Sequence, residues 1–186
     1  MNGMPKPTEQ AIIRLLQQPG KKREAFEMLV TTYREQVYWQ IRRMVLSHDD
    51  ADDVMQETFI RIWTHLDTFR QEAKLSTWIY RIALNECLAF LNKQRLQNNI
   101  SLDDAEGEVL CQLESDPWFD GDLLQCKLQQ AIQTLPDKQR FVFNQKYFDG
   151  KKYEEIAQVT GVTVGALKAS YHHAVKKIQA FLEKDT

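Results

Sequence analysis

Apolar residues recur every three or four positions along most of the chain, which is the spacing of one face of an α-helix. The clearest run is Phe26, Leu29, Val30, Tyr33, Val37, Ile41, Met44 and Val45. No segment alternates convincingly between apolar and polar residues, so the pattern argues against a sheet. We therefore expect an all-α protein.

Two more long helices are expected in the first half of the chain. One begins near Asp50, where three aspartates suit the positive end of a helix, and runs to Leu66. The next begins after Leu75 with Ser76 as its N-cap and runs toward Leu96. Together with the run from Phe26, these helices can bury one shared core, which predicts a domain over residues 21–97. Residues 9–17 allow a short additional helix on that domain.

Residues 98–121 lose the helical period and predict an acidic linker. Ser101–Asp122 holds eight acids and no Lys or Arg, with breaks at Gly107, Pro117 and Gly121. Apolar residues within the linker allow it to dock on another surface: Val109, Leu110, Leu113, Trp118 and Phe119. From Leu123 onward there are ten Lys and Arg against six Asp and Glu, although the whole chain has a net charge of −2. The C-terminal third is therefore a candidate binder of polyanions.

The C-terminal third predicts a second helical domain over residues 122–184. Four helices are expected, at 122–134, 137–147, 153–160 and about 163–182. The last two, with a turn centred on Gly161, have the spacing of a helix-turn-helix. Gly161 can take the left-handed conformation that ends the first helix, and Thr163 can cap the second.

The last helix has two different faces when projected at about 100° per residue. One stripe is apolar and must face the core: Leu167, Tyr171, Ala174 and Ile178. The opposite face suits close approach to a DNA groove: Gly165, Ala169, His172, His173 and Lys176, flanked by Lys168 and Lys177. The alternative is an ordinary helical hairpin with a solvated basic face. A metal or catalytic histidine pair is not favoured, because adjacent helical residues diverge and no third ligand is near.

Two stretches of the first domain also suggest binding surfaces. Residues 69–95 interleave aromatic and basic residues, which suits single-stranded nucleic acid, and the loop 70–75 offers a shallow pocket for a flipped base. Trp78 on its own fits a core position better than a base platform. The acidic stretch Asp49–Trp63 would repel phosphates, which implies a protein partner. Its acids equally well complement a helix dipole, and sequence alone does not separate the two explanations.

Several classes of function are not supported. No apolar stretch is long enough to span a membrane and the N-terminus has no signal-peptide pattern, so we expect a cytoplasmic protein. Three cysteines without ligand spacing predict reduced thiols and neither a disulfide framework nor a metal site. No phosphate-binding loop, zinc-protease motif or nucleophile elbow is present, so we expect neither a cofactor nor an enzyme.

Three motifs in one order carry a specific resemblance: DADDVMQETFIRIW, then FR followed by STWIYRIALN, then the stretch from LPDKQRFVF to AVKKI. Together they resemble the extracytoplasmic-function (ECF) sigma factors of bacteria, over about Phe26 to Leu182. The resemblance implies a protein that directs core RNA polymerase to promoters and assists promoter melting. It also implies two domains: a sigma region 2-like bundle and a region 4-like helix-turn-helix.

The resemblance assigns roles motif by motif. In the family the first motif docks on the β′ clamp helices of polymerase, which assigns that role to Asp53, Gln56 and Glu57. The packed side of the same motif is formed by Phe59, Ile60 and Trp63. The second corresponds to the helix and loop that melt and read the minus-ten element: Phe69, Arg70, Lys74, Trp78, Tyr80, Arg81 and Asn85. The third reads the minus-thirty-five element as duplex or supports it: Lys146, Tyr153, Glu154, Gly165, Lys168, Ala169, Ser170, His172, His173, Lys176 and Lys177.

Partners and departures follow from the same resemblance. The implied partners are the polymerase β′ clamp helices and β flap, promoter DNA as duplex and as melted strand, and an anti-sigma factor that can hold the protein at the inner membrane. Many family members have Thr-Val-Lys/Arg-Ser-Arg where this chain has residues 166–170, and an Arg-rich stretch where it has residues 171–173. We therefore expect more affinity to depend on Lys168, Lys176 and Lys177. The alternatives are a stand-alone helix-turn-helix regulator and a sigma-like decoy that binds a regulatory protein.

Overall fold

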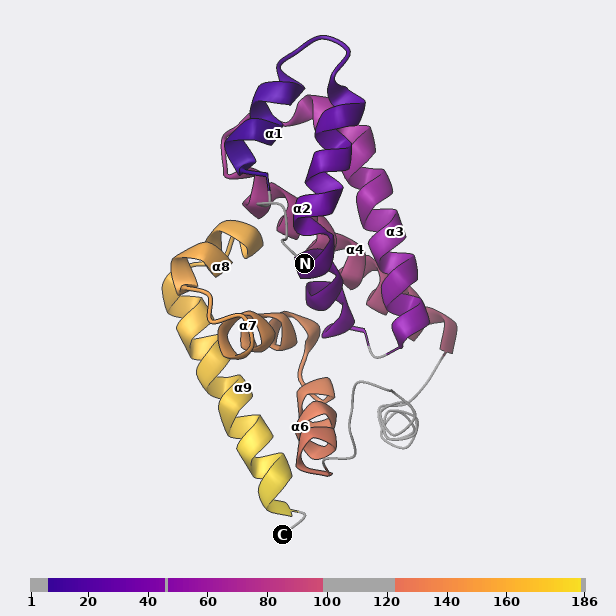
Figure 1. Cartoon of the computed structure of the whole chain (residues 1–186). Helices are drawn as coiled ribbons and strands as arrows, with labels where there is room; N and C mark the ends of the chain where they lie inside the picture. Colours follow the sequence, from indigo (N-terminus) through magenta and orange to yellow (C-terminus); the bar gives the residue numbers. More distant parts are fainter. Residues whose placement is uncertain (1–6, 46, 99–122, 185–186) are drawn as a thin grey trace, which may run out of the picture.

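The computed structural model describes residues 7–45, 47–98 and 123–184, and those ranges contain helices and no strand (Figure 1). The N-terminal group is α1 (Glu9–Leu16), α2 (Lys22–Arg42), α3 (His48–His65), the 3-10 turn η1 (Leu66–Thr68) and α4 (Leu75–Asn98). The C-terminal group is α6 (Leu123–Gln133), α7 (Asp137–Tyr147), α8 (Tyr153–Thr160) and α9 (Val164–Lys184). The predicted acidic linker and Cys111 lie outside the described residues. None of the helices in those ranges is both long and apolar enough to cross a bilayer.

Helices α3 and α4 begin where a side chain accepts from one of their first amides. Ser47 precedes α3 and its hydroxyl accepts a hydrogen bond from the Asp50 amide at 3.3 Å, so the helix begins two residues before the predicted start. The prediction of Ser76 as the cap of α4 was wrong. The helix begins at Leu75, whose amide donates to the Glu9 carboxylate of α1 at 2.6 Å, and Ser76 already lies inside the first turn.

Two apolar clusters hold the helices together. The larger lies between α1, α2, α3 and α4, where Ile12, Leu29 and Ile62 are fully buried. It continues into the C-terminal group through Phe141 of α7 and Leu167 of α9. The smaller joins α6, α7 and α9: Ala131, Ile132, Leu135, Phe143, Ala174 and Ile178. The C-terminal helices therefore have a small core of their own and also pack against the first bundle.

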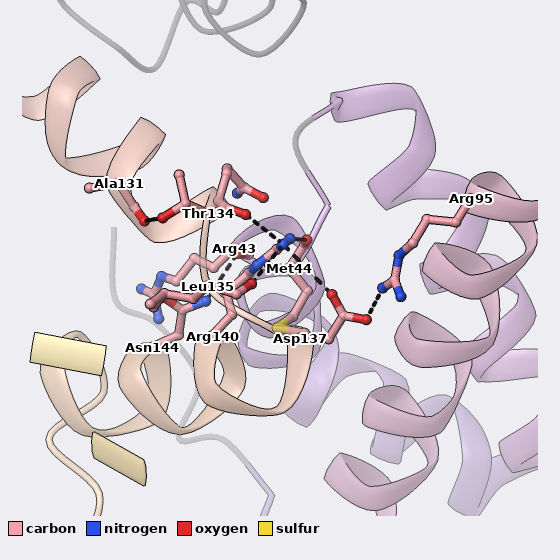
Figure 2. A network of polar contacts seen from close by, with 10 residues as sticks. Arg43, Met44, Arg95, Ala131, Thr134, Leu135, Asp137, Arg140 and Asn144 are labelled. Atoms are coloured by element: carbon pink, nitrogen blue, oxygen red, sulfur yellow. Dashed lines mark hydrogen bonds and ion pairs between the residues drawn. The ribbon is translucent and has the colours of Figure 1, made fainter. Parts of the chain in front are cut away.

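Helix α7 docks on the end of α2 through hydrogen bonds to its backbone (Figure 2). The carbonyl groups at a helix C-terminus have no partner within the helix. Arg140 Nη1 donates to the Met44 carbonyl at 2.9 Å, and Asn144 Nδ2 donates to the Arg43 carbonyl at 3.0 Å. The side chains of α7 thus donate hydrogen bonds to the two backbone carbonyls just beyond α2.

Arg140 links this junction to the rest of the C-terminal group. It is buried, and its Nη2 also donates to the carbonyls of Gln133 and Leu135. Burial lowers the pKa of the Arg140 guanidinium, and the Asp137 carboxylate, 3.7 Å away, opposes that effect. Asp137 also pairs with Arg95 of α4 (Figure 2). A buried cation with these partners makes the contact between the two groups specific in geometry.

We predict that Asn144→Ala weakens the docking of the two helical groups. The substitution leaves the Arg43 carbonyl without its donor, and an unsatisfied buried acceptor costs about 1–3 kcal/mol. Small-angle X-ray scattering should show a larger radius of gyration, with unchanged helix content by circular dichroism. Gln179→Ala, at an exposed position on α9, is the matched control. An unchanged radius of gyration in Asn144→Ala would contradict the prediction.

The turn between α8 and α9 has the predicted chemistry. Gly161 ends α8 in the left-handed conformation, with φ of 72°, and its amide donates to the Ala157 carbonyl at 2.8 Å. The Thr163 hydroxyl accepts from the Ala166 amide at 3.4 Å at the start of α9. Both the glycine C-cap and the threonine N-cap expected from the sequence are confirmed.

We predict opposite effects on stability for two alanine substitutions at this motif. Gly161→Ala places a Cβ at positive φ and should lower the free energy of unfolding by about 1 kcal/mol. Gly165→Ala lies inside α9, where a Cβ meets nothing within 4 Å, and should raise it by about 0.5–1 kcal/mol. Urea unfolding followed by circular dichroism measures both. Equal effects of the two substitutions would rule out the conformational explanation.

Candidate polymerase and nucleic-acid interfaces

The outer face of α9 is arranged as the sequence predicts. Leu167, Ala174 and Ile178 are buried and Tyr171 packs against the same clusters, so the predicted core stripe is confirmed. The proposed DNA-contacting residues lie on the other side, and all but the half-buried Ser170 are exposed: Gly165, Lys168, Ala169, Ser170, His172, His173, Lys176 and Lys177. The small residues leave backbone accessible and the lysines lie around it, which suits a DNA groove.

Tyr153 at the start of α8 connects two of the cations. Lys146 Nζ lies 5.0 Å and Lys168 Nζ 5.9 Å from the centre of its ring, and Lys146 also donates to the Lys151 carbonyl at 3.2 Å. The ring therefore places two ammonium groups beside the first turn of α8, where Glu154 is exposed. No group of three or more possible metal ligands occurs in the part of the chain that the structure describes.

The proposed polymerase surface lies on the solvent side of α3. Asp53, Gln56 and Glu57 are exposed, and the helix buries instead its stripe of Ala51, Val54, Thr58 and Ile62. The expectation that Ile60 belongs to a packed side was wrong for this structure, because its side chain is 48% exposed. Trp63 is 39% exposed, but its ring packs on that of Phe26 with centres 5.1 Å apart. The helical period places Ile60 on the same side as Asp53 and Gln56, and Trp63 at the edge of that side. Only Phe59 is half-buried, against Phe26.

The acids at the start of α3 lie close enough to influence one another. Ser47 already caps the helix, and burial together with the charges of Asp53 and Asp49 raises the pKa of Asp50. A carboxylate that is destabilised by its neighbours adds little to the stability of its own helix. Like charges around Asp50 therefore oppose its ionisation at this end of α3.

The proposed minus-ten residues divide into two sets. The first set surrounds the loop before α4. Phe69 packs against Trp78 with ring centres 5.4 Å apart, and Arg70 and Lys74 are exposed. Trp78 is half-buried, whereas Ile79, the next residue of α4, is fully buried. This set offers aromatic and basic groups to solvent on one side of the molecule.

The second set, Tyr80, Arg81 and Asn85, faces the C-terminal helices. Lys151 Nζ lies 4.0 Å from the centre of the Tyr80 ring. Burial, with the charges of Asp149 and Glu9, raises the pKa of Tyr80 to about 12. Arg81 Nη2 donates to the Gln158 carbonyl of α8 at 2.5 Å.

A groove of about 690 Å³ separates α4 from the helix-turn-helix, and Arg81, Asn85 and Ser170 all line it. Residues assigned to two different DNA elements therefore line a single groove.

The sequence analysis did not identify the residues that hold the C-terminal helices against the N-terminal bundle. Arg140 and Asn144 lie four positions apart on the buried side of α7. Polar residues at core spacing were a usable signal, because a buried polar group needs a partner. Their partners lie 96 and 101 residues away along the chain, so no local pattern points to them. No sequence pattern pointed to Gln158, because Arg81 uses only its backbone carbonyl.

Two family models match the chain. Residues 29–97 match sigma-70 region 2 and residues 127–178 match sigma-70 region 4. Two solved structures share the fold at 21% identity. CnrH in complex with the cytosolic domain of CnrY superposes with a TM-score of 0.68 and covers 96% of this chain and 98% of its own. The sigma factor RpoE of Bartonella quintana, in complex with the anti-sigma factor NepR, superposes with a TM-score of 0.65 and covers 88% and 99%.

Curated relatives are similar over nearly their whole length. The ECF RNA polymerase sigma-E factor of Haemophilus influenzae is 31% identical over 92% of this chain and 94% of its own. The sigma factor SigW of Bacillus subtilis is 32% identical over 86% and 89%. The sigma-H factor of Pseudomonas aeruginosa is 32% identical over 89% and 90%. With both sigma-70 regions present in order and the all-helical fold matched, the chain belongs to the ECF group of RNA polymerase sigma factors, which direct polymerase to promoters.

Proposed function

We propose that the protein acts by binding alone, with separate surfaces for core polymerase, the minus-ten strand and the minus-thirty-five duplex. The observation that carries this proposal is the exposure of three chemically different surfaces on α3, on the loop before α4 and on α9. Sigma factors are regulatory proteins, and we infer that this one catalyses no reaction of its own. Because polymerase works in the cytoplasm, we place the protein there.

The polymerase surface is the exposed acidic side of α3. Asp53, Gln56 and Glu57 present carboxylates and an amide one helical turn from the exposed Ile60 and Trp63. A charged patch beside exposed apolar side chains has the composition of a protein interface rather than of a DNA surface. We assign it to the clamp helices of the β′ subunit.

The single-strand surface comprises Phe69, Arg70, Lys74 and Trp78, with Tyr80, Arg81 and Asn85 available once the C-terminal helices move away. Aromatic rings stack on exposed bases and cations follow the backbone. The duplex surface is the outer face of α9, supported by the pair of lysines around Tyr153. Lysines that contact phosphates position the helix, and the small and polar residues between them face the base edges.

The two DNA surfaces work together only if the helical groups separate. The centres of the minus-ten and minus-thirty-five elements lie ~25 base pairs apart, which is ~85 Å at ~3.4 Å per base pair. In the structure Arg81 of one surface donates a hydrogen bond to α8 of the other motif. We therefore infer that the docked arrangement is a state that opens when polymerase and promoter bind.

An anti-sigma factor is a further proposed partner. CnrH and the Bartonella sigma factor, which share this fold, were solved with the cytosolic domain of CnrY and with the anti-sigma factor NepR. The surfaces that an inhibitor has to cover in this chain are those of α3 and α4. A membrane-bound inhibitor would hold the protein at the inner membrane.

A reconstituted transcription assay tests the main proposal. Core polymerase from the source organism, with a library of its promoter fragments, should initiate specifically only when this protein is added. Sequencing of the transcript starts then gives the promoter. If a folded protein binds duplex DNA but starts no transcript, a stand-alone regulator is the better description, and binding of neither DNA nor polymerase would favour a decoy.

We predict that Lys168→Ala weakens binding to the minus-thirty-five duplex and lowers its salt dependence. Loss of one phosphate contact should reduce the slope of log K against log salt by about 0.9. Fluorescence anisotropy with the duplex at several salt concentrations measures both quantities. Lys184→Ala, in the last turn of α9, removes the same charge away from the turn and is the control. An identical slope in both variants would exclude Lys168 from the interface.

A further inference from the structure

The N-terminus of α4 lacks a capping side chain of its own. Lys74 precedes the helix, and its carbonyl accepts from the Trp78 amide at 3.1 Å, so it occupies the capping position. An ammonium group has no acceptor and is unfavourable at the positive end of a helix. The first turn of α4 contains no acid. The free amides of this turn therefore need an acceptor from elsewhere in the molecule.

Glu9 of α1 supplies that acceptor. One carboxylate oxygen accepts from the Leu75 amide at 2.6 Å, and the other lies 3.5 Å from the Ser76 amide. The second oxygen also accepts from the Tyr33 hydroxyl at 3.3 Å. Three helices, α1, α2 and α4, thus meet at one carboxylate. Burial first, and then the charge of Glu9, raises the pKa of Tyr33, so its hydroxyl stays protonated as a donor.

The position of Glu9 is fixed by contacts of α1 and of Tyr33. It is the first residue of α1, which Thr8 caps through a hydrogen bond from the Ala11 amide at 3.3 Å. The fully buried Ile12 fixes α1 against the bundle. The ring of Tyr33 lies against that of Tyr80, with centres 6.3 Å apart. The carboxylate is therefore connected to a proposed DNA-binding residue as well as to the helix end.

The loop that Glu9 anchors is the one proposed to bind the melted strand. The first end of the loop is fixed by Phe69. The Phe69 ring packs on Trp78, and the Phe69 amide donates to the Leu66 carbonyl at 3.3 Å. Its second end is fixed by Glu9 at Leu75. Between them Gln71 is held at a φ of 58°, a conformation that non-glycine residues rarely adopt. A loop with this strained residue depends on both anchors for its shape.

We propose that Glu9 is a positioning residue for recognition of the minus-ten strand. It contacts no DNA and instead sets the shape of the loop at 70–74 through the amides of α4. This inference rests on the proposed function, which assigns that loop to the melted strand. It gives α1, which lies before the residues matched to region 2, a role in promoter opening.

The test compares Glu9→Gln with wild-type protein assembled with core polymerase. A glutamine keeps one oxygen for the Leu75 amide but loses the charge and turns one acceptor into a donor. Loss of a helix cap is worth about 1 kcal/mol, which is about five-fold in an equilibrium constant. We expect about five-fold weaker binding of the holoenzyme to the single-stranded minus-ten oligonucleotide of a promoter from the transcription assay. Binding to the minus-thirty-five duplex should stay within about two-fold.

Two further variants make the result decisive. Glu24→Gln removes an exposed carboxylate from the first turn of α2, where it pairs with Lys21, and should bind both DNAs like wild type. Glu9→Asp keeps the charge with a shorter reach and should bind the oligonucleotide better than Glu9→Gln. Equal loss of oligonucleotide, duplex and polymerase binding in Glu9→Gln would show a general role in folding and overturn the proposal. Oligonucleotide binding by Glu9→Gln that equals that of the wild-type protein would also overturn the proposal.

Failure of the proposed function gives a different outcome. In that case the wild-type holoenzyme itself would bind no minus-ten oligonucleotide and start no transcript. The role of Glu9 is overturned separately, when the wild type binds the strand and Glu9→Gln binds it equally well.

Discussion

The carbonyl groups just beyond α2 need hydrogen-bond donors, and the source of those donors sets the arrangement of the molecule. Within α2 the ladder ends at Arg42, and the next carbonyls, of Arg43 and Met44, face the C-terminal helices. Asn144 and Arg140 of α7 donate to them. Because α7 also packs on α8 and α9, this one junction places the helix-turn-helix against α4. The position of the helix-turn-helix relative to α4 therefore depends on these hydrogen bonds together with the shared apolar cluster.

The same constraint operates at the opposite kind of helix end. The N-terminus of α4 presents free amides behind a lysine that cannot accept them, and the acceptor is Glu9, 66 residues earlier in the chain. In both places a long helix is completed by a side chain from another element. Each such contact joins a segment proposed to bind DNA to the core, because the loop proposed for the melted strand precedes α4 and the helix proposed for the duplex lies beyond α7 in the chain.

The helices were predictable from the sequence because their signals are local. Pro136 before α7, Gly161 after α8 and Thr163 before α9 act within one turn of chain, and the bounds of α7 and α8 match the prediction. The side of α9 that faces solvent follows from the helical period. The contacts between helices were not predictable, because Glu9 and Arg140 act on backbone groups far away in the chain. Ser76 was predicted as the cap because the local sequence does not show that a carboxylate of α1 accepts from the first amides of α4. The charged site residues other than Lys146 are exposed, whereas Tyr80 is half-buried beneath Lys151. Their contacts with polymerase and DNA remain predictions.

The docked arrangement combines backbone hydrogen bonds, ion pairs and a shared apolar cluster. Arg140 and Asn144 donate to backbone carbonyls, and Arg43 pairs with Asp149. A typical hydrogen bond contributes only about 0.5–1.5 kcal/mol, because water replaces the partner when the groups separate. The apolar part is incomplete, since a groove of about 690 Å³ lies between α4 and the helix-turn-helix. The exposed pairs at the edge, such as Arg95 with Asp137, are partly screened by solvent. The opening proposed for polymerase and promoter binding therefore breaks these polar contacts and also the apolar contacts of Phe141 and Leu167 with the first bundle.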